Sequence, residues 1–482
     1  MKEIIIIGSG IGGLVAGNLL AKKGHKVTIF ESHSMPGGYT AGFWRKGCYF
    51  ESGTLGFESY ASVLKAMRDI GVEDRLEFIK LGMRVVSEDF DGKPGDFEEF
   101  KRIIYSAYPS EKEKLDKVFA ELGSIISVFM GDSDFIIPGI SSGAEAIKSI
   151  LPMIPKLPKI MKLTGKYGKM TASEFAGGYF EKDSKLYNLF SGFGYPDMSA
   201  IFVGTAIAGV FNEVWTVREG MQAWADVLAE NFRILGGELK LCSYVDSIIT
   251  KDGEAVGVSC KGIEYKADHV ISAGDYKKTF LKLLDDKSLV PQPLIKKIEG
   301  APVSEAFFTV YLGLDMNNEE LARHMKAYHV YHMDRKPGCS IYDSNDSEYF
   351  NKAAYFLHSP SMINDKHAPD GKSSLMLQVR VPHRWMGNWG SGDREAYRRL
   401  KENAMNTVIS RAAEVIPGLL DSIEYKDAAT PLTYERFTHN TDGASCAWSW
   451  NPRKAFFKDA IGVTVKTPVR NLYIGSCWAM QV

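Results

Sequence analysis

The sequence predicts an α/β fold in which a Rossmann-type dinucleotide-binding domain is interleaved with a second, α+β domain. Three observations support this prediction. The apolar, β-branched residues 4–7 lead directly into a glycine-rich turn and then into a helical pattern. Residues 25–30 form a second strand pattern that ends in an acidic residue, Glu31. The chain has 482 residues, which is too many for one ordinary core and favours two domains.

The first element is a strand followed by a glycine-rich turn, residues 8–13 (GSGIGG). Four successive isoleucines before the turn are typical of a strand buried on both faces of a parallel sheet. We expect Gly8 to form the tight turn, Gly10 to let the backbone approach a pyrophosphate, and Gly13 to let helix and strand pack closely. The free amide groups at the start of the helix would hold the phosphate charge.

The second strand pattern ends at Glu31, 23 positions beyond Gly8. A carboxylate at this place can accept hydrogen bonds from the ribose hydroxyls of an adenosine. An acidic residue instead of a basic one argues against NADP, because a free 2′-hydroxyl is favoured. These residues alone leave FAD and NAD open.

A second glycine pair, Gly37 and Gly38, follows the acid closely. With it, the N-terminal region resembles the flavin amine oxidase and phytoene desaturase superfamily, and the resemblance implies FAD bound on a GR2-like domain. By resemblance, Gly37 and Gly38 would lie against the pyrophosphate and ribityl chain, and Val245 would meet the adenine. The resemblance implies these cofactor-binding residues: Gly8, Ser9, Gly10, Ile11, Gly12, Gly13, Glu31, Ser32, Gly37, Gly38, Thr40, Arg45, Gly53, Thr54, Leu55, Val245, Gly475 and Ser476.

Later segments resemble one branch of that superfamily, the phytoene desaturases, carotenoid isomerases and retinol saturases. They are residues 217–221, 236–239, 360–371 and 429–437. Residues 469–476 resemble the family's last flavin-binding strand, which is usually followed by a glycine-rich turn and a helix. Because the chain stops at Val482, the comparison with the family predicts truncation there.

The same resemblance divides the chain into alternating parts of two domains. The FAD-binding domain is expected over residues 1–75, 211–280 and 431–482. The substrate domain is expected over residues 76–210, as a helical insertion with membrane contact, and over residues 281–430. Within the insertion, Ser110 is predicted to cap a helix that continues through Leu122.

Composition excludes several classes of function. A net charge of -1 gives no field that would collect nucleic acid. The six cysteines are scattered without metal-ligand spacing, so we expect no metal and buried thiols in a reducing compartment. No leader and no stretch of about 18 to 20 apolar residues is found, which favours a cytoplasmic protein.

Residues 146–173 contain six lysines among apolar residues and no acid. A basic, apolar, helix-prone segment is typical of a membrane interface, so one hypothesis is peripheral membrane contact. The alternative is a solvated lysine face over a helix that packs on the core. Charge patterning favours the alternative, and the resemblance to enzymes of lipid-dissolved polyisoprenoids favours the membrane.

The resemblance implies an FAD-dependent oxidoreductase that desaturates, saturates or isomerises carbon-carbon double bonds of an apolar polyene or isoprenoid. The catalytic residues stay open. His383, Arg384, Glu435 and Arg436 are candidates for acid, base or positioning roles, or else belong to structural ion pairs and loops. Tryptophans 385, 389, 448 and 450 could line an apolar tunnel or belong to the core. An amine or small-molecule oxidase is the alternative enzyme, and a flavin- or lipid-binding carrier is the alternative outside enzymes; oligomeric state is not predicted.

Overall fold

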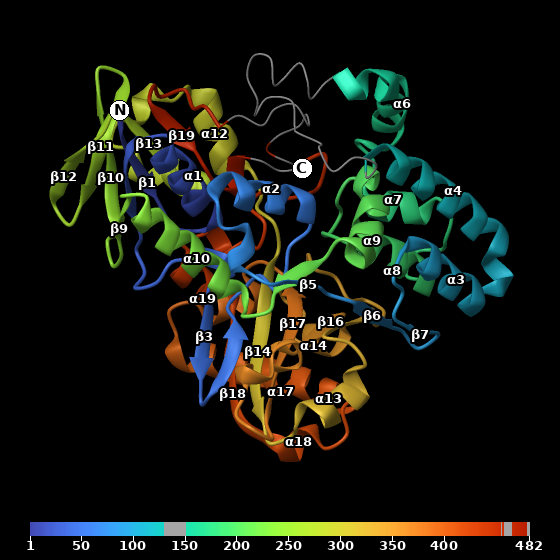
Figure 1. The fold of residues 1–482 in the computed structure, drawn as a ribbon. Coiled ribbons are helices and arrows are strands. Elements are labelled where there is room, and N and C mark those ends of the chain that lie inside the picture. Colours follow the sequence, from blue (N-terminus) through green and yellow to red (C-terminus); the bar gives the residue numbers. More distant parts are fainter. Residues whose placement is uncertain (130–150, 455, 457–464, 480–482) are drawn as a thin grey trace.

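The computed structural model describes residues 1–129, 151–454, 456 and 465–479. Three lobes are evident in Figure 1: a parallel sheet with its helices, a group of helices, and a second sheet below them. Residues 1–30 and 465–479 lie together in the first lobe although they are far apart in the sequence (Figure 1).

The first lobe is built on a five-stranded parallel sheet with the order β19-β13-β1-β2-β9. Its strands are β1 (Glu3–Ile7), β2 (Lys26–Phe30), β9 (Glu238–Lys240), β13 (His269–Ser272) and β19 (Leu472–Ile474). In the register, Ile5 of β1 lies between Thr28 of β2 and Val270 of β13. The Rossmann-type fold predicted from the N-terminal motif is confirmed.

Both faces of this sheet are covered, which explains why β1 is apolar throughout. On one face lie α1 (Ile11–Lys22), α2 (Tyr60–Ile70) and α10 (Met221–Ile234). On the other lie α12 (Gln292–Gly300) and an antiparallel three-stranded sheet, β10 (Val245–Lys251), β11 (Glu254–Cys260) and β12 (Ile263–Lys266). Ile4 and Ile6 pack on the face covered by α1, α2 and α10, and Ile5 packs on the face covered by α12 and the three-stranded sheet.

The second sheet has seven strands in the order β18-β14-β17-β16-β15-β6-β7. They are β6 (Met83–Val86), β7 (Asp91–Gly92), β14 (Ala306–Leu314), β15 (His329–His332), β16 (Tyr355–His358), β17 (Ser373–Val381) and β18 (Ile423–Ala429). Neighbouring strands are antiparallel except β15 and β6. One face packs on α13 (Asn318–Met325), α14 (Tyr349–Lys352) and α17 (Arg394–Ala413), which leaves the opposite face for the site described below.

The third lobe is helical. It contains α3 (Phe97–Ala107), α4 (Lys112–Phe129), α6 (Leu157–Tyr167), α7 (Ala172–Gly177), α8 (Lys185–Gly192) and α9 (Val203–Asn212). The predicted cap at Ser110 is wrong. Residues Pro109–Glu111 form a 3₁₀ turn that runs on into α4 without a break, so no free helix start exists there for Ser110 to cap.

Shorter elements join the lobes. They are β3 (Gly42–Arg45), β4 (Cys48–Glu51), β5 (Phe78–Lys80), β8 (Trp215–Val217), α11 (Tyr276–Lys278), α15 (Pro360–Ile363), α16 (Trp385–Gly390), α18 (Leu419–Ser422) and α19 (Pro431–Thr438). None of the helices that the structure describes is long and apolar enough to cross a membrane. All strands of the parallel sheet come from the segments predicted for the FAD-binding domain, but the domain boundaries themselves stay a prediction.

For three of the tryptophans the core alternative is confirmed, and one expectation about the cysteines needs correction. Trp385, Trp389 and Trp448 are core residues, because all are at most 3% exposed and none lines the large cavity described below. All six cysteines are free, but Cys242 and Cys477 are exposed instead of buried. Cys477 lines the large cavity, where packed side chains do not cover it.

Candidate functional site

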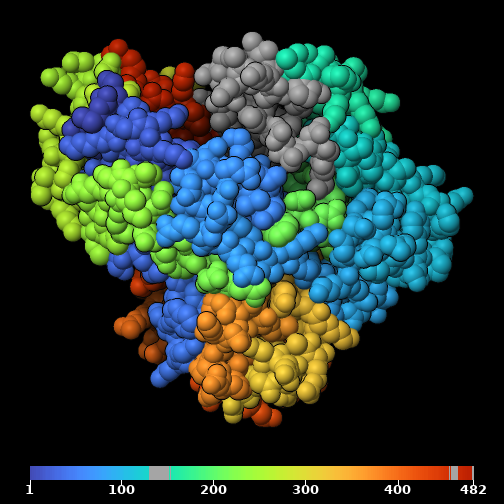
Figure 2. Space-filling view, in the orientation of Figure 1, coloured from blue at the N-terminus to red at the C-terminus, as the bar shows by residue number. Residues whose placement is uncertain are grey.

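A cavity of about 670 Å³ opens at the carboxyl ends of the parallel strands. Its walls include the residues that follow β1, β2, β13 and β19, for example Gly8, Glu31, Gly274 and Ser476. This is the edge of an open α/β sheet at which ligands bind. Figure 2 shows α1 and α2 in blue beside α10 in green, the helices that cover one face of this sheet. The volume lies within the range of about 300–1,000 Å³ that is usual for cofactor sites.

The glycine turn at the start of α1 is as tight as the sequence predicts. Gly8 takes a φ of +100°, a backbone region in which residues with a side chain are strained. A Cβ on Gly13 would lie 2.1 Å from the Gly8 carbonyl oxygen, so only glycine lets the helix approach the strand. Gly10 lines the cavity, and a Cβ there would meet nothing within 4 Å. The open space beside Gly10 suits the close approach of a ligand phosphate.

Glu31 is 8% exposed and ties the turn to the end of β2. Its Oε2 accepts hydrogen bonds from the backbone N–H and the hydroxyl of Ser9, at 2.8 and 2.7 Å. Its Oε1 accepts from the His33 N–H at 2.9 Å and from the Ser32 hydroxyl at 3.1 Å. Four donors fill the roughly four lone-pair positions of a carboxylate. Glu31 therefore positions the phosphate-binding turn as well as facing the cavity.

The second glycine pair lies directly against the first turn. The Gly37 N–H donates to the Ser9 carbonyl at 3.0 Å, and a Cβ on Gly38 would lie 3.4 Å from Gly10 Cα. The Thr40 hydroxyl donates to the Gly37 carbonyl at 2.7 Å and fixes the loop. The two glycine motifs, 29 positions apart by their first residues, thus form one continuous cavity wall.

Most of the residues expected at the cofactor contribute to the cavity wall. These are Gly8, Gly10, Ile11, Gly12, Glu31, Ser32, Gly37, Gly38, Thr40, Arg45, Val245 and Ser476. The others do not line it: Ser9, Gly13, Gly53, Thr54, Leu55 and Gly475. Some of these act from behind, since the Thr54 N–H donates to the carbonyl of Tyr39, which lines the wall, at 2.8 Å. That any of them touches the cofactor stays a prediction.

Polar residues that sequence reasoning missed also lie at the cavity. Asp275, which follows β13, accepts hydrogen bonds from the N–H groups of Lys278 and Thr441, at 2.8 and 2.6 Å. Burial raises the pKa of the Asp275 carboxyl above its usual range. Lys278 lines the cavity and lies 3.2 Å from Glu435. Their position directly after a parallel strand is a signal that could have identified them.

A hydrogen-bonded set of side chains connects the seven-stranded sheet to the cavity wall through Tyr434 of α19. Tyr434 and Thr309 share a hydrogen bond of 2.6 Å, and Gln378 donates to Thr309 at 3.3 Å. Tyr311, on the same face of β14 as Thr309, lines the cavity together with Tyr434. Burial raises the pKa values of both Tyr311 and Tyr434, so both phenols stay protonated. Their scattered positions in the sequence explain why no motif revealed them.

The four candidate catalytic residues are not brought together at the cavity. His383, Arg384, Glu435 and Arg436 are all absent from its wall. The Arg384 side chain is 71% exposed and lies 3.5 Å from Asp442. Glu435 is the ion-pair partner of Lys278, which supports the structural alternative for that residue. Burial lowers the pKa of His383, so it is a neutral side chain without a charge to offer.

Glu51 joins the strand β4 to the helix α10. It is 3% exposed and accepts hydrogen bonds from the Met221 N–H and the Tyr49 hydroxyl, both at 2.9 Å. Burial raises the pKa of Glu51 from 4.5 to about 8. In the window between these values the folded state holds a proton that the unfolded state releases, so the contribution of Glu51 to stability falls as pH rises.

Replacing Glu51 by glutamine is expected to remove this pH dependence. Within the window, each pH unit lowers the free energy of unfolding of the unmodified protein by at most about 1.4 kcal/mol, and the variant lacks this loss. The melting temperature of Glu51→Gln relative to the unmodified protein should therefore increase with pH. The measurement is thermal unfolding at both ends of the window from 4.5 to about 8. Glu238→Gln, at an exposed site, is the control and should show a constant difference. A constant difference for Glu51→Gln as well would contradict the prediction.

The fold and the site define a protein that binds a dinucleotide cofactor at the edge of a Rossmann-type sheet. Residues 11–400 match the family described as flavin containing amine oxidoreductase. The chain belongs to this family. It is an FAD-dependent oxidoreductase, and the cofactor expected from the second glycine pair is confirmed.

Three curated relatives show the branch that the later motifs resemble. A 4,4'-diapophytoene desaturase (4,4'-diapolycopene-forming) from Methylomonas sp is 26% identical, with 94% of this chain and 88% of the relative covered. An all-trans-retinol 13,14-reductase from Danio rerio is 26% identical, with 98% and 82% covered. A chloroplastic prolycopene isomerase from Daucus carota is 25% identical, with 92% and 71% covered.

The fold is also similar to that of solved structures. Putrescine oxidase, solved as the wild type bound to putrescine, has a TM-score of 0.65 and 14% sequence identity. The match covers 98% of this chain and 93% of that one. At this identity the likeness shows the fold.

Proposed function

We propose that this protein uses FAD to desaturate, saturate or isomerise carbon-carbon double bonds of an apolar polyene or isoprenoid. The observation that carries the proposal is the similarity, over nearly the whole chain, to relatives named as a polyene desaturase, reductase and isomerase. The cavity supports it, because its wall joins the dinucleotide turn to aromatic residues such as Phe43, Tyr311 and Tyr434.

The described residues fit the two ends of a dinucleotide. Gly10 leaves open space for the pyrophosphate, and the amides at the start of α1 face it. Glu31 would accept a ribose hydroxyl in place of the Ser32 hydroxyl, the longest of its four hydrogen bonds. Lys278 supplies a cation at the same wall. When bound, FAD supplies the redox chemistry, and the chain's residues bind it, orient it and exclude water.

The first test is the visible spectrum of the purified protein with added FAD, followed by anaerobic incubation with polyenes and, separately, incubation with simple amines in the presence of oxygen. The proposal expects flavin absorbance and a change in the number or geometry of double bonds of a polyene, detected by chromatography. Rapid hydrogen peroxide formation with amines and no polyene conversion would favour the alternative oxidase. A bound flavin that no donor reduces would favour a carrier.

The membrane contact proposed for residues 146–173 has a physical basis where the structure describes them. Residues 146–150 lie outside the described part. Apolar side chains point into solvent from the 3₁₀ segment Leu151–Lys156 and from α6, with Leu151, Ile154 and Met161 exposed by 55%, 51% and 72%. Lys162 and Lys169 are exposed near them, while Leu163 and Tyr167 pack on the core. Exposed apolar and basic side chains together are what an anionic lipid surface attracts.

We expect Met161→Glu to weaken binding to vesicles of anionic phospholipid about tenfold or more, because burying a methionine is worth about 1.5–3 kcal/mol. Thr164→Glu, at an exposed polar position of the same helix, adds the same charge and is the control. Flotation with the vesicles at low salt measures both. If the unmodified protein stays at the bottom of the gradient, the membrane proposal is wrong.

A further inference from the structure

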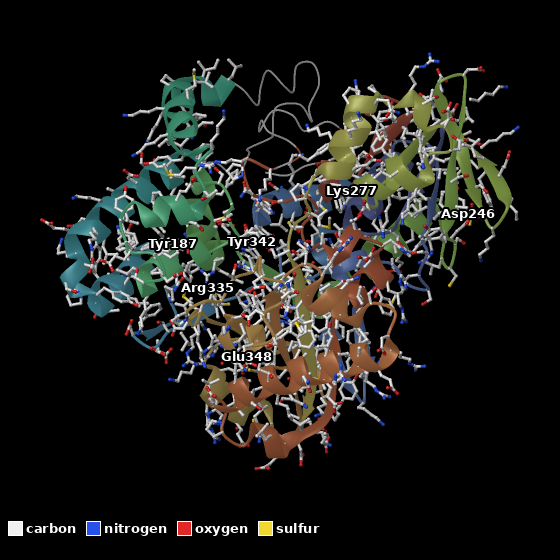
Figure 3. The ribbon with its side chains drawn as sticks, turned by 180° about the vertical axis from the view of Figure 1, so that it is seen from behind. Tyr187, Asp246, Lys277, Arg335, Tyr342 and Glu348 are labelled. Atoms are coloured by element: carbon white, nitrogen blue, oxygen red, sulfur yellow. The ribbon has the colours of Figure 1, made fainter. Side chains whose placement is uncertain are left out.

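A second, smaller cavity of about 60 Å³ lies where the helical lobe meets the seven-stranded sheet. Its wall is formed by Ser191 and Gly192 at the end of α8, and by Tyr331, Phe356, Arg335 and Arg380. Figure 3 labels Arg335 at this junction, between the helices and the strands of the sheet. The cavity is separate from the large one, since no residue of the described ranges lines both.

Among the residues that the structure describes, two guanidinium groups line this cavity and no carboxylate does. Arg335 donates to the backbone carbonyl of Asn188 at 3.0 Å, and no carboxylate of the described residues forms an ion pair with it. The Nε of Arg380 is buried without a hydrogen-bond partner among the described residues. Its nearest carboxylate, Glu305, lies 3.9 Å away. Glu305 offsets one of the two positive charges, which leaves one charge unmatched.

The backbone is shaped to admit Arg335. A Cβ on Gly192 would lie 2.5 Å from the Arg335 Nη2 and 3.3 Å from its Cζ. Glycine at this position therefore lets the guanidinium lie against the end of α8. The end of the flexible side chain is what would have to move, so a larger residue would displace Arg335 without disturbing the backbone.

The rest of the wall is largely apolar. Tyr331 and Phe356 stack with ring centroids 4.2 Å apart, and Arg380 lies over the Phe356 ring at 5.6 Å. Ile341, Ala353 and Ala354 complete this side. Because about 10–15 Å³ of such space holds one water molecule, the cavity accommodates a group of a few heavy atoms. Guanidinium groups bind carboxylates through paired N–H donors.

We propose that this cavity binds the carboxylate of an apolar organic acid, with Arg335 as the principal partner and Arg380 as the second. The single unmatched positive charge fits a monoanion such as a carboxylate better than a doubly charged phosphate. The aromatic and aliphatic wall takes the first carbons of the apolar chain. The inference concerns a site outside the cofactor cavity and does not depend on the reaction proposed above.

The test is fluorescence titration of the FAD-loaded protein with cis-parinaric acid, a conjugated polyene acid, and with its methyl ester. The acid is expected to bind at least about tenfold more tightly than the ester, a difference of about 1.4 kcal/mol. Arg335→Gln and Gly192→Ala should each weaken acid binding to the level of the ester and leave ester binding unchanged. Arg398→Gln, at an exposed position of α17, is the control and should change neither.

Equal affinity for acid and ester overturns the proposal, as does unchanged acid binding in Arg335→Gln. Far-ultraviolet circular dichroism and the flavin spectrum verify that each variant is folded, and Arg335→Lys, which keeps the charge, should retain part of the acid binding. Failure of the polyene reaction would leave the arginine-dependent binding of the acid in place. The two outcomes are therefore distinguishable.

Discussion

Replacing Gly10 by alanine is expected to leave the protein folded and to abolish most of its FAD binding. A Cβ on Gly10 meets nothing within 4 Å, so the substitution has room in the protein alone. Because Gly10 lines the large cavity, the added methyl group occupies space that a pyrophosphate needs. We expect the dissociation constant for FAD to rise by about 100-fold, or about 2.7 kcal/mol, measured by flavin fluorescence quenching.

Two other glycines give this experiment its controls. A Cβ on Gly300, in α12, also meets nothing within 4 Å, and Gly300 does not line the large cavity, so Gly300→Ala should bind FAD normally. A Cβ on Gly13 would overlap the Gly8 carbonyl at 2.1 Å, so Gly13→Ala should lose stability as well as FAD. Normal FAD binding by Gly10→Ala would show that the pyrophosphate does not lie at this turn.

Replacing Glu31 by glutamine is expected to weaken both the protein and its affinity for FAD. The carboxylate accepts four hydrogen bonds, two of them from the Ser9 N–H and hydroxyl. A glutamine amide has only one acceptor oxygen, and its NH₂ group is itself a donor. In Glu31→Gln the NH₂ group would therefore face donors that now bind one of the two carboxylate oxygens. A buried donor left without a partner costs roughly 1–3 kcal/mol, and the free energy of unfolding of the FAD-free protein should fall by about that amount.

The loss of FAD affinity should add to this effect, because the displaced Ser9 carries the phosphate-binding turn with it. Thermal unfolding without FAD and titration with FAD measure the two parts separately. Glu238→Gln is the matched control, since Glu238 lies on the neighbouring strand β9 with a side chain 58% exposed and paired with Lys240. It should cost only about 0–1 kcal/mol. Unchanged stability in Glu31→Gln would contradict the hydrogen bonds from Ser9 to Glu31, and unchanged FAD affinity would contradict the proposed place of the ribose beside Glu31.

The dinucleotide end of the site was predictable because its chemistry is local in the sequence. Gly8, Gly13 and Glu31 are needed for backbone geometry and hydrogen bonding within one strand-helix-strand unit, and the structure has them in those conformations. The opposite wall was not predictable. Thr309 and Tyr311 lie on β14, and Tyr434 reaches Thr309 from α19, the helix that follows β18. No short pattern specifies that these segments meet.

Burial was the other quantity that the sequence could not supply. His383 and Arg384 were candidates because they are adjacent polar residues, but one is neutral by burial and the other is directed to Asp442 at the surface. Asp275 and Lys278 are polar residues that look no more unusual in the sequence, and they nevertheless belong to the cavity wall. The difference follows from which strand end precedes each residue.

The parallel sheet has a consequence for the order in which the protein acquires its structure. Strands β1 and β13 pair although Ile5 and Val270 are 265 positions apart, and β13 then pairs with β19 through Val270 and Leu472. Such a high contact order makes folding slow, because the entropy of closing long loops is lost before the contacts form. During synthesis the N-terminal strand-helix-strand unit emerges first, with the outer edges of β1 and β2 unpaired until β13 and β9 follow. The protein can close its cofactor-binding edge only after residues 472–474 have left the ribosome, so this edge is completed long after its first strand has been synthesised.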